Sequence, residues 1–336
     1  MNLKKIGLTA LAGSLVATSL VAGEMSVTGS ASMKVRSVAG DSAGKGFSMG
    51  NQLEFAGGGE LDNGMTVSLN FVLDQNDDST AVTSTAGTTG ASGPYTGGPF
   101  DSHSVSISSD AMGKLVFHGE GGSSAQAAID TTAAGDLWDN GYGISTSNDP
   151  SASAGGDNML VYTLPSMVDG IAVTASYAPR TAGSIDSSAS FGVGYTGIEG
   201  LSFNWATGED NSAVATTVDV NTMKLSYAIG SFSVGYSDTD YDSESTTVTA
   251  DQNVRSYNVS YTVSENISVG YGIESISQPN DTTADHQDIE VSALTASYTA
   301  GGMTLSAMMG EADNIAHTTS AAEDKEMWHL VASFAF

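Results

Sequence analysis

Three stretches of this 336-residue chain match ligand-binding or catalytic motifs by letter. Residues 192–197 read G-x-G-x-x-G, the phosphate-binding turn of dinucleotide enzymes, and residues 46–50 read G-x-S-x-G, the turn that presents a nucleophilic serine. Residues 238–244 carry an acid at every second position, as at the start of a calcium loop. The corresponding chemistry would be pyrophosphate binding, acyl transfer and calcium binding.

The surroundings of each motif argue against that chemistry. The first two motifs need a helix after the turn, yet both lie in sequence that alternates like a strand. In the third, Ser243 and Thr249 replace the glycine and the closing glutamate that a calcium loop requires. The chain has no cysteine, and its five histidines show no metal-ligand spacing: His103, His118, His286, His317 and His329. We therefore predict no enzyme, no metal and no cofactor.

The charge balance limits the partners. Ten lysines and arginines stand against 38 acids, a formal net charge of −28. Because phosphate backbones need a basic stripe, nucleic acid is excluded as a partner. Charged residues are only 14% of the chain, and the polar remainder is mostly serine, threonine, glycine and asparagine. Cations, water and small polar solutes are the expected partners.

The first 23 residues have the features of a cleaved secretory signal. Lys4 and Lys5 precede an uncharged apolar run from Ile6 to Ala22, which closes on small residues before Glu24. A membrane anchor is the alternative interpretation, since the run is near the lower limit for a bilayer helix. We predict that residues 1–23 are the signal and that residues 24–336 form one exported domain.

From Ser26 onward the pattern has period two. Val27, Ala31, Met33 and Val35 share one face of the first such segment, and polar residues occupy the other. The same alternation recurs at residues 65–74, 171–177, 201–205, 223–229 and 267–274. A soluble β-sandwich alternates in the same way, so the pattern alone does not say where the apolar face points.

The connections between these segments predict the strand number. Seven short links are expected at residues 58–64, 109–113, 165–170, 197–200, 230–231, 264–266 and 300–302. Eight longer polar links are expected near residues 39–46, 75–102, 120–158, 179–188, 208–217, 238–253, 277–287 and 311–324. Fifteen connections predict about sixteen strands. The expected fold is all-β, a closed transmembrane antiparallel β-barrel with a long third loop.

Aromatic residues indicate that the apolar face meets lipid. Seven of them lie on the apolar face just before a short link or the chain end: Phe55, Tyr162, Tyr195, Tyr227, Tyr261, Tyr298 and Phe336. Aromatics at one depth form a ring, and membrane interfaces favour such rings. Ordinary strand aromatics are the alternative interpretation. Inward positions are then mostly serine, threonine, glycine and asparagine, which predicts a wet lumen without a packed apolar core.

The whole exported domain resembles the sixteen-stranded general diffusion porins of Gram-negative outer membranes, particularly the alphaproteobacterial type. The resemblance rests on the signal, the opening residues 24–29, the strand count, the long third loop and the final strand 327–336, which ends in Phe336. It implies a homotrimer in the outer membrane, with a third loop folded into each lumen and Phe336 read by the barrel-assembly machinery. The Pro-Glu-Phe-Gly-Gly stretch of enterobacterial third loops is absent, and residues 135–138 stand in that region.

Charges in the expected lumen suggest the selectivity. The third loop carries acids and no lysine or arginine, and the predicted constriction includes Asp130, Asp136, Asp139 and Asp149. By strand parity Lys34, Arg36 and Lys114 project inward opposite this loop. We therefore expect passive diffusion of small hydrophilic solutes and ions with a preference for cations. The alternative is a secreted acidic adhesin or a surface-layer or structural β protein.

Overall fold

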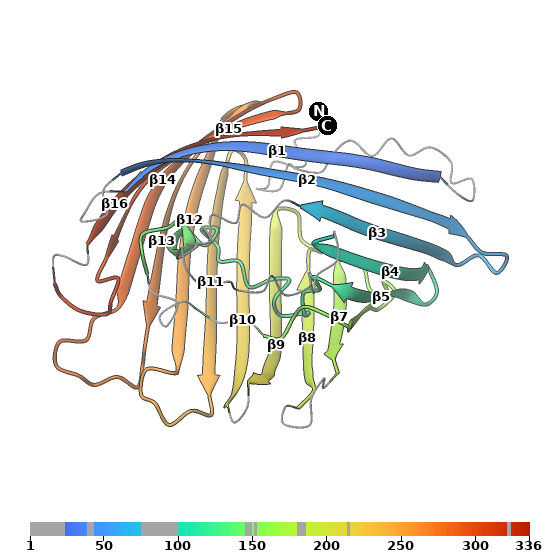
Figure 1. Cartoon of the computed structure of the whole chain (residues 1–336), viewed down its shortest axis with the longest axis horizontal. Helices are drawn as coiled ribbons and strands as arrows, with labels where there is room; N and C mark the ends of the chain where they lie inside the picture. Colours follow the sequence, from blue (N-terminus) through green and yellow to red (C-terminus); the bar gives the residue numbers. More distant parts are fainter. Residues whose placement is uncertain are drawn as a thin grey trace, which may run out of the picture.

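The computed structural model describes residues 24–38, 44–74, 100–144, 150, 153–179, 186–213, 216–320 and 324–336. Sixteen antiparallel strands close into one barrel in which each strand pairs with its neighbours in the chain (Figure 1). This confirms the predicted fold and strand number. The strands are β1 Glu24–Val38, β2 Gly44–Glu60, β3 Thr66–Asp74, β4 Ser102–Ser109, β5 Gly113–Glu120, β6 Met159–Thr163, β7 Ile171–Ala178, β8 Ser188–Tyr195, β9 Leu201–Ala213, β10 Thr216–Ile229, β11 Phe232–Ser243, β12 Gln252–Ser264, β13 Ile267–Ser277, β14 Ile289–Ala300, β15 Met303–Asp313 and β16 Lys325–Ala335.

The two ends of the chain close the barrel. β1 pairs with β2 on one side and with β16 on the other. The Gly29 N–H donates to the Phe336 carbonyl at 2.7 Å, and the Phe336 N–H donates back to the Gly29 carbonyl at 2.9 Å. The Phe336 ring lies against the Cα of Gly29, where a side chain would collide with it. Glycine at position 29 therefore allows the last residue to complete the ladder.

The motifs that resemble enzyme sites lie in strands. Residues 192–197 end β8 and enter a short turn, and residues 46–50 lie within β2. Asp238, Asp240 and Asp242 alternate along β11, so they do not form a calcium loop. Within the described residues the helical structure is the single turn η1, Leu137–Asp139, and no helix there is long and apolar enough to cross a membrane.

An apolar band surrounds the outside of the barrel. β10 illustrates it, because Met223, Leu225, Tyr227 and Ile229 share the outward face and are each 38–63% exposed. Farther round the barrel, β12 and β14 present Tyr261 and Tyr298 at the short-turn end of the same band. Side chains this apolar and this exposed are stable against hydrocarbon rather than water, so the band marks the part of the wall that spans the membrane.

Beyond this band, toward the long-loop rim, the apolar side changes from outside to inside. On β10, Val220 is fully buried inside the barrel, whereas Asp219 is exposed outside. Strands β9 and β10 continue to residues 213 and 216, and β11 and β12 continue to residues 243 and 252. The predicted polar links at 208–217 and 238–253 were therefore too long. These segments resemble loops in sequence because the alternation changes phase where the strand leaves the membrane.

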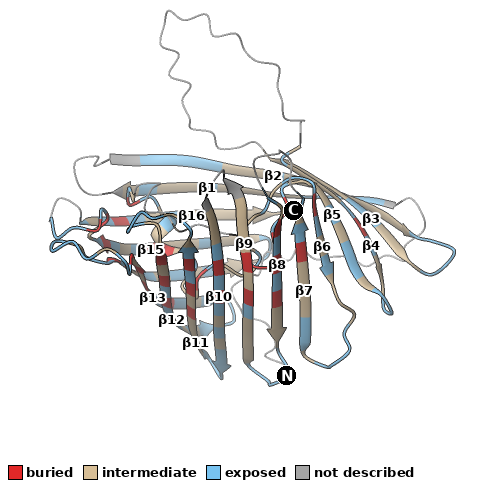
Figure 2. Ribbon diagram, turned by 90° about the horizontal axis from the view of Figure 1, so that it is seen from below, coloured by how far each residue is buried: buried red, intermediate tan, exposed pale blue. Residues whose placement is uncertain are grey.

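The lumen near this rim contains a packed apolar cluster, so the prediction of a lumen without an apolar core was wrong. Leu137 and Tyr142 of the third loop pack there with inward residues of β10 to β16. The strand members are Val220, Tyr241, Val254, Ile276, Ile289, Val291, Ala293, Met308, Ala312 and Met327. Figure 2 shows buried positions on the strands around β8 to β13. Inward side chains at this level are covered by the third loop instead of water.

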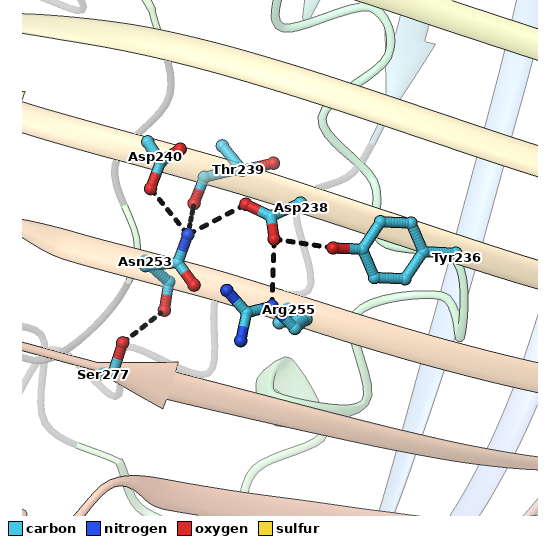
Figure 3. Close-up of polar contacts among 7 residues, drawn as sticks. All are labelled: Tyr236, Asp238, Thr239, Asp240, Asn253, Arg255 and Ser277. Atoms are coloured by element: carbon cyan, nitrogen blue, oxygen red, sulfur yellow. Dashed lines mark hydrogen bonds and ion pairs between the residues drawn. The ribbon is translucent and has the colours of Figure 1, made fainter.

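The outward face at the same level carries a polar network (Figure 3). The Arg255 Nε donates to Asp238 at 2.9 Å, and the Tyr236 hydroxyl donates to the same carboxylate at 2.8 Å. Asn253 Nδ2 donates to Asp238 at 2.9 Å and to Asp240 at 2.6 Å. A strand-borne charge that faces outward is tolerable where the apolar band has ended. This network therefore marks the upper limit of the membrane-spanning wall.

Candidate pore constriction

The segment between β5 and β6 is here called L3, and its described residues 121–144, 150 and 153–158 lie inside the barrel. Its backbone and one amide side chain donate hydrogen bonds to inward hydroxyl groups of five strands, β7, β8, β10, β11 and β12. These bonds join Ala125 N to Ser176 Oγ (3.0 Å), Gln126 N to Ser190 Oγ (2.7 Å), Gln126 Nε2 to Thr222 Oγ1 (2.8 Å), Ala133 N to Ser237 Oγ (2.8 Å) and Ala134 N to Ser256 Oγ (2.9 Å). The buried N–H groups of L3 are thereby satisfied by the wall.

A buried carboxylate extends this ladder to β13. Glu274 is fully buried and accepts the Trp138 N–H at 3.0 Å and the Thr132 hydroxyl. The Thr132 hydroxyl in turn accepts the N–H of Asp136 at 2.8 Å. Because a buried carboxylate is tolerated only with such donors, Glu274 and the L3 turn around Thr132 stabilise each other.

The acids of L3 lie on the turn that Glu274 holds. Asp136 has a left-handed backbone (φ 54°) and accepts the Thr132 N–H at 2.9 Å. Burial, and then the neighbouring Asp136, raises the pKa of Asp130 to about 6. The same two causes raise the pKa of Asp139, against the opposing charge of Lys34. Lys224 of β10 donates to the Thr131 carbonyl, and its charge interacts with those of Asp136 and Asp130.

The wall opposite this turn is basic. Lys34 and Arg36 lie two residues apart on β1, and their charges act on His329 of β16, which is directly opposite Arg36 in the ladder. The Arg36 guanidinium contacts Gly141 of L3, and the charge of Lys34 reaches Asp139. L3 therefore spans the lumen from β13 to β1, with carboxylates on the loop and cations on the wall.

Most of the predicted constriction residues come together, with two exceptions. Asp130, Asp136, Asp139, Lys34 and Arg36 all lie at L3 or against it. Lys114 instead follows the short turn 110–112, at the end of β5 remote from L3. Asp149 lies outside the described residues.

Three residues of the constriction were missed from the sequence. Lys224 and His329 have inward parity on their strands, which was the available signal for both. Glu274 was counted among the polar positions of an alternating segment, and the sequence carries no sign that a loop 136 residues earlier donates to it. Among the described residues no three histidines or acids are placed to hold a metal ion.

This arrangement narrows the lumen with charged and polar groups. A solute that passes L3 exchanges its water for hydroxyl, carboxylate and guanidinium groups, which suits hydrated polar molecules and disfavours apolar ones. The charges stand on opposite sides of the passage, so the local field is directed across it. Such a site can select solutes by charge and polarity.

Comparison with known proteins agrees with this geometry. The family described as Gram-negative porin matches residues 7–284. The anion-selective porin from Comamonas acidovorans has 15% identity and a TM-score of 0.65, and the alignment covers 94% of this chain and 100% of that one. A loop-deletion variant of OmpT from Vibrio cholerae has 16% identity and a TM-score of 0.66, and the alignment covers 94% of this chain and 100% of that one. A variant of the Rh. blastica porin has 14% identity and a TM-score of 0.63, with 93% of this chain and 100% of that one covered. No curated protein matches in sequence.

We expect Glu274→Gln to loosen L3. The amide loses one acceptor oxygen and leaves either Trp138 N–H or the Thr132 hydroxyl without its partner, at a cost of about 1–3 kcal/mol. Planar-bilayer recordings should show larger and noisier single-channel currents. Glu265→Gln, in the short turn between β12 and β13, is the matched control. Unchanged currents in Glu274→Gln would mean that the carboxylate does not hold the loop.

A pair of glycine substitutions isolates the contact of Arg36 with L3. Gly141 and Gly143 have φ of +87° and +89°, so alanine strains the backbone equally at both, by about 1–2 kcal/mol. A methyl group at 141 meets the Arg36 guanidinium, whereas one at 143 meets nothing. We expect Gly141→Ala to push this side chain toward the open lumen and lower the conductance. Gly143→Ala should keep the conductance at a similar melting temperature; equal conductance in both variants would contradict the contact.

Proposed function

Because the chain belongs to the Gram-negative porin family, an outer-membrane channel family, we propose that it passes small hydrophilic solutes and ions by diffusion and favours cations. The observation that carries the cation preference is the group of carboxylates on L3, Asp130, Asp136 and Asp139, inside a chain with a net charge of −28. A low-dielectric wall strengthens their potential where bulk salt would screen it. Lys34 and Arg36 on the facing wall keep part of the passage attractive to anionic groups.

The fold alone does not decide ion preference. The structurally similar porin from Comamonas acidovorans is described as anion-selective, although it shares the barrel. Selectivity must therefore come from the side chains at L3 and the wall that it faces. Membership of a family of channels disfavours the alternative of a secreted adhesin or surface-layer protein.

We also propose a homotrimer, export through the signal at residues 1–23, and recognition of Phe336 by the barrel-assembly machinery. Trimers are usual in the family, and residues 1–23 lie outside the described part of the chain. Phe336 is 73% exposed in the closed barrel, and its backbone pairs with Gly29. An unheated gel of the detergent-extracted protein should show a trimer band that is lost on boiling.

Replacing the three L3 acids should reduce the cation preference. In a planar bilayer under a salt gradient we expect a reversal potential of cation sign, and a smaller one for Asp130→Asn, Asp136→Asn and Asp139→Asn combined. The effect should be severalfold in the permeability ratio, because three charges are removed from one narrow zone.

The matched control removes three acids from the short-turn rim, with Asp62→Asn, Asp110→Asn and Asp169→Asn combined. It changes the net charge equally but leaves L3 intact, so its reversal potential should stay near that of the parent. A reversal potential of anion sign in the parent, or equal shifts in both triple variants, would overturn the proposal.

Acidification should also weaken the cation preference. The pKa of Asp130 is raised to about 6, so this carboxylate becomes neutral as the pH falls through 6, where an ordinary aspartate stays charged. The permeability ratio for cations over anions should therefore fall between about pH 7 and pH 5. In Asp130→Asn this step should vanish. A step of unchanged size in that variant would assign it to another group.

A further inference from the structure

Two connections on the long-loop rim are joined to each other. L7 comprises residues 278–288 between β13 and β14, and L8 here means residues 314–320 and 324, the described part of the connection between β15 and β16. The Gln287 N–H donates to the His317 carbonyl at 3.0 Å, and Asn314 Nδ2 donates to the Asp288 carbonyl at 3.2 Å. The rings of His286 and His317 stack with centroids 5.0 Å apart and planes 13° apart. Sequence spacing gave no sign of this pair.

One hydrogen bond fixes which ring nitrogen of neutral His317 carries the hydrogen. Its Nδ1 lies 2.9 Å from the Gln287 carbonyl, which can only accept, so Nδ1 carries the hydrogen. In the neutral ring Nε2 then carries a lone pair and no hydrogen, and this atom is buried without a hydrogen-bond partner among the described residues. Only 5% of His317 is exposed. A proton on Nε2 would therefore place a charge and an unsatisfied N–H in the contact between the two loops.

This contact is linked to the constriction through Ile315. Ile315 lies two residues before His317 and is 5% exposed, in the same apolar cluster as Leu137 and Tyr142 of L3. Residues 314 and 317 both have a left-handed backbone, with φ of 57°. The tight turn between them holds the Ile315 side chain in the apolar cluster while the His317 ring packs against L7. Release of His317 therefore withdraws part of the cover of L3.

We propose that L7 and L8 form an acid-released latch: neutral His317 holds the two loops together, and its protonation separates them and frees Ile315 from the cluster that covers L3. This device is independent of ion preference, so it can stand or fall without the proposed function.

The charges around His317 act in both directions, and burial prevails. His286 faces it from L7 and opposes the protonation of His317, whereas Asp288 and Asp281 of L7 favour it. Asp324, at the end of L8, binds the Asn314 N–H at 3.3 Å. Burial comes first among the causes, and the pKa of His317 is lowered from its usual 6.5. The open loops consequently bind the proton more tightly, and the latched state loses stability as the pH falls below 6.5.

Spin labels on the two loops would test the latch directly. Ala284→Cys and Thr319→Cys place one label on each loop at exposed positions, and the chain has no other cysteine. In the full barrel in detergent we expect one narrow distance distribution at about pH 7.5, and a second, longer population at about pH 4.5 that disappears on return to the higher pH. An unchanged distribution at about pH 4.5 would overturn the proposal.

Two histidine substitutions assign the effect. His317→Gln cannot titrate and should abolish the change in distance with pH, whether its loops rest together or apart. His103→Gln, on β4 away from both loops, should keep the full change. Persistence of the change in His317→Gln would show that other groups, such as Asp281, control the loops and would refute the role of His317. Intact heat-modifiable gel mobility checks that each variant is folded.

Discussion

This structure depends on one constraint: every backbone N–H and C=O group within the membrane needs a hydrogen-bond partner from the protein. Hydrocarbon offers no partner for an N–H or a C=O group, so a chain that crosses it with strands must pair every strand on both sides. β1 meets this requirement by pairing with β2 and with β16, which closes the sheet. Once the backbone is satisfied in this way, side chains are free to respond to whatever surrounds each part of the wall.

The wall meets different surroundings along its height, and the side chains follow them. In the membrane-spanning part, apolar residues face outward and the lumen is polar. Nearer the long-loop rim the outside is wet, as Asp238 and Arg255 show, and the inside is filled by L3, so apolar residues turn inward around Leu137 and Tyr142. The same strand thus behaves like a membrane barrel in one half and like a soluble barrel in the other.

This change of surroundings explains which features the sequence could predict. Period-two alternation and the glycine-containing short turns depend on neighbouring residues only, and they predicted the closed sixteen-stranded fold. Parity predicted that Lys34 and Arg36 project inward, and the structure places the Arg36 guanidinium against Gly141 of L3. The continuation of β9 to β12 was missed because a change of phase cancels the alternation on which the prediction depends. From local sequence alone, such a strand segment is predicted to be a polar loop.

The remaining misses concern contacts between distant residues. Glu274 and Trp138 meet only because L3 folds back across the lumen, and no local pattern on β13 announces it. Lys114 has the expected parity but lies at a different level along the barrel axis from L3. The level of a residue depends on where its strand begins relative to the neighbouring strands. Parity can be derived from the sequence of one strand, whereas the level of a residue along the barrel axis depends on the register of the whole barrel.

The bond between Gly29 and Phe336 has a consequence for the order of folding. It joins residues at the two ends of the barrel sequence, so closure carries the largest loop entropy of any contact in the sheet. Until β16 arrives, β1 presents a bare edge that could pair with another polypeptide. During assembly of this barrel, closure by β16 therefore competes with edge-to-edge association of β1 with another polypeptide. Any factor that shields β1 would favour the native barrel.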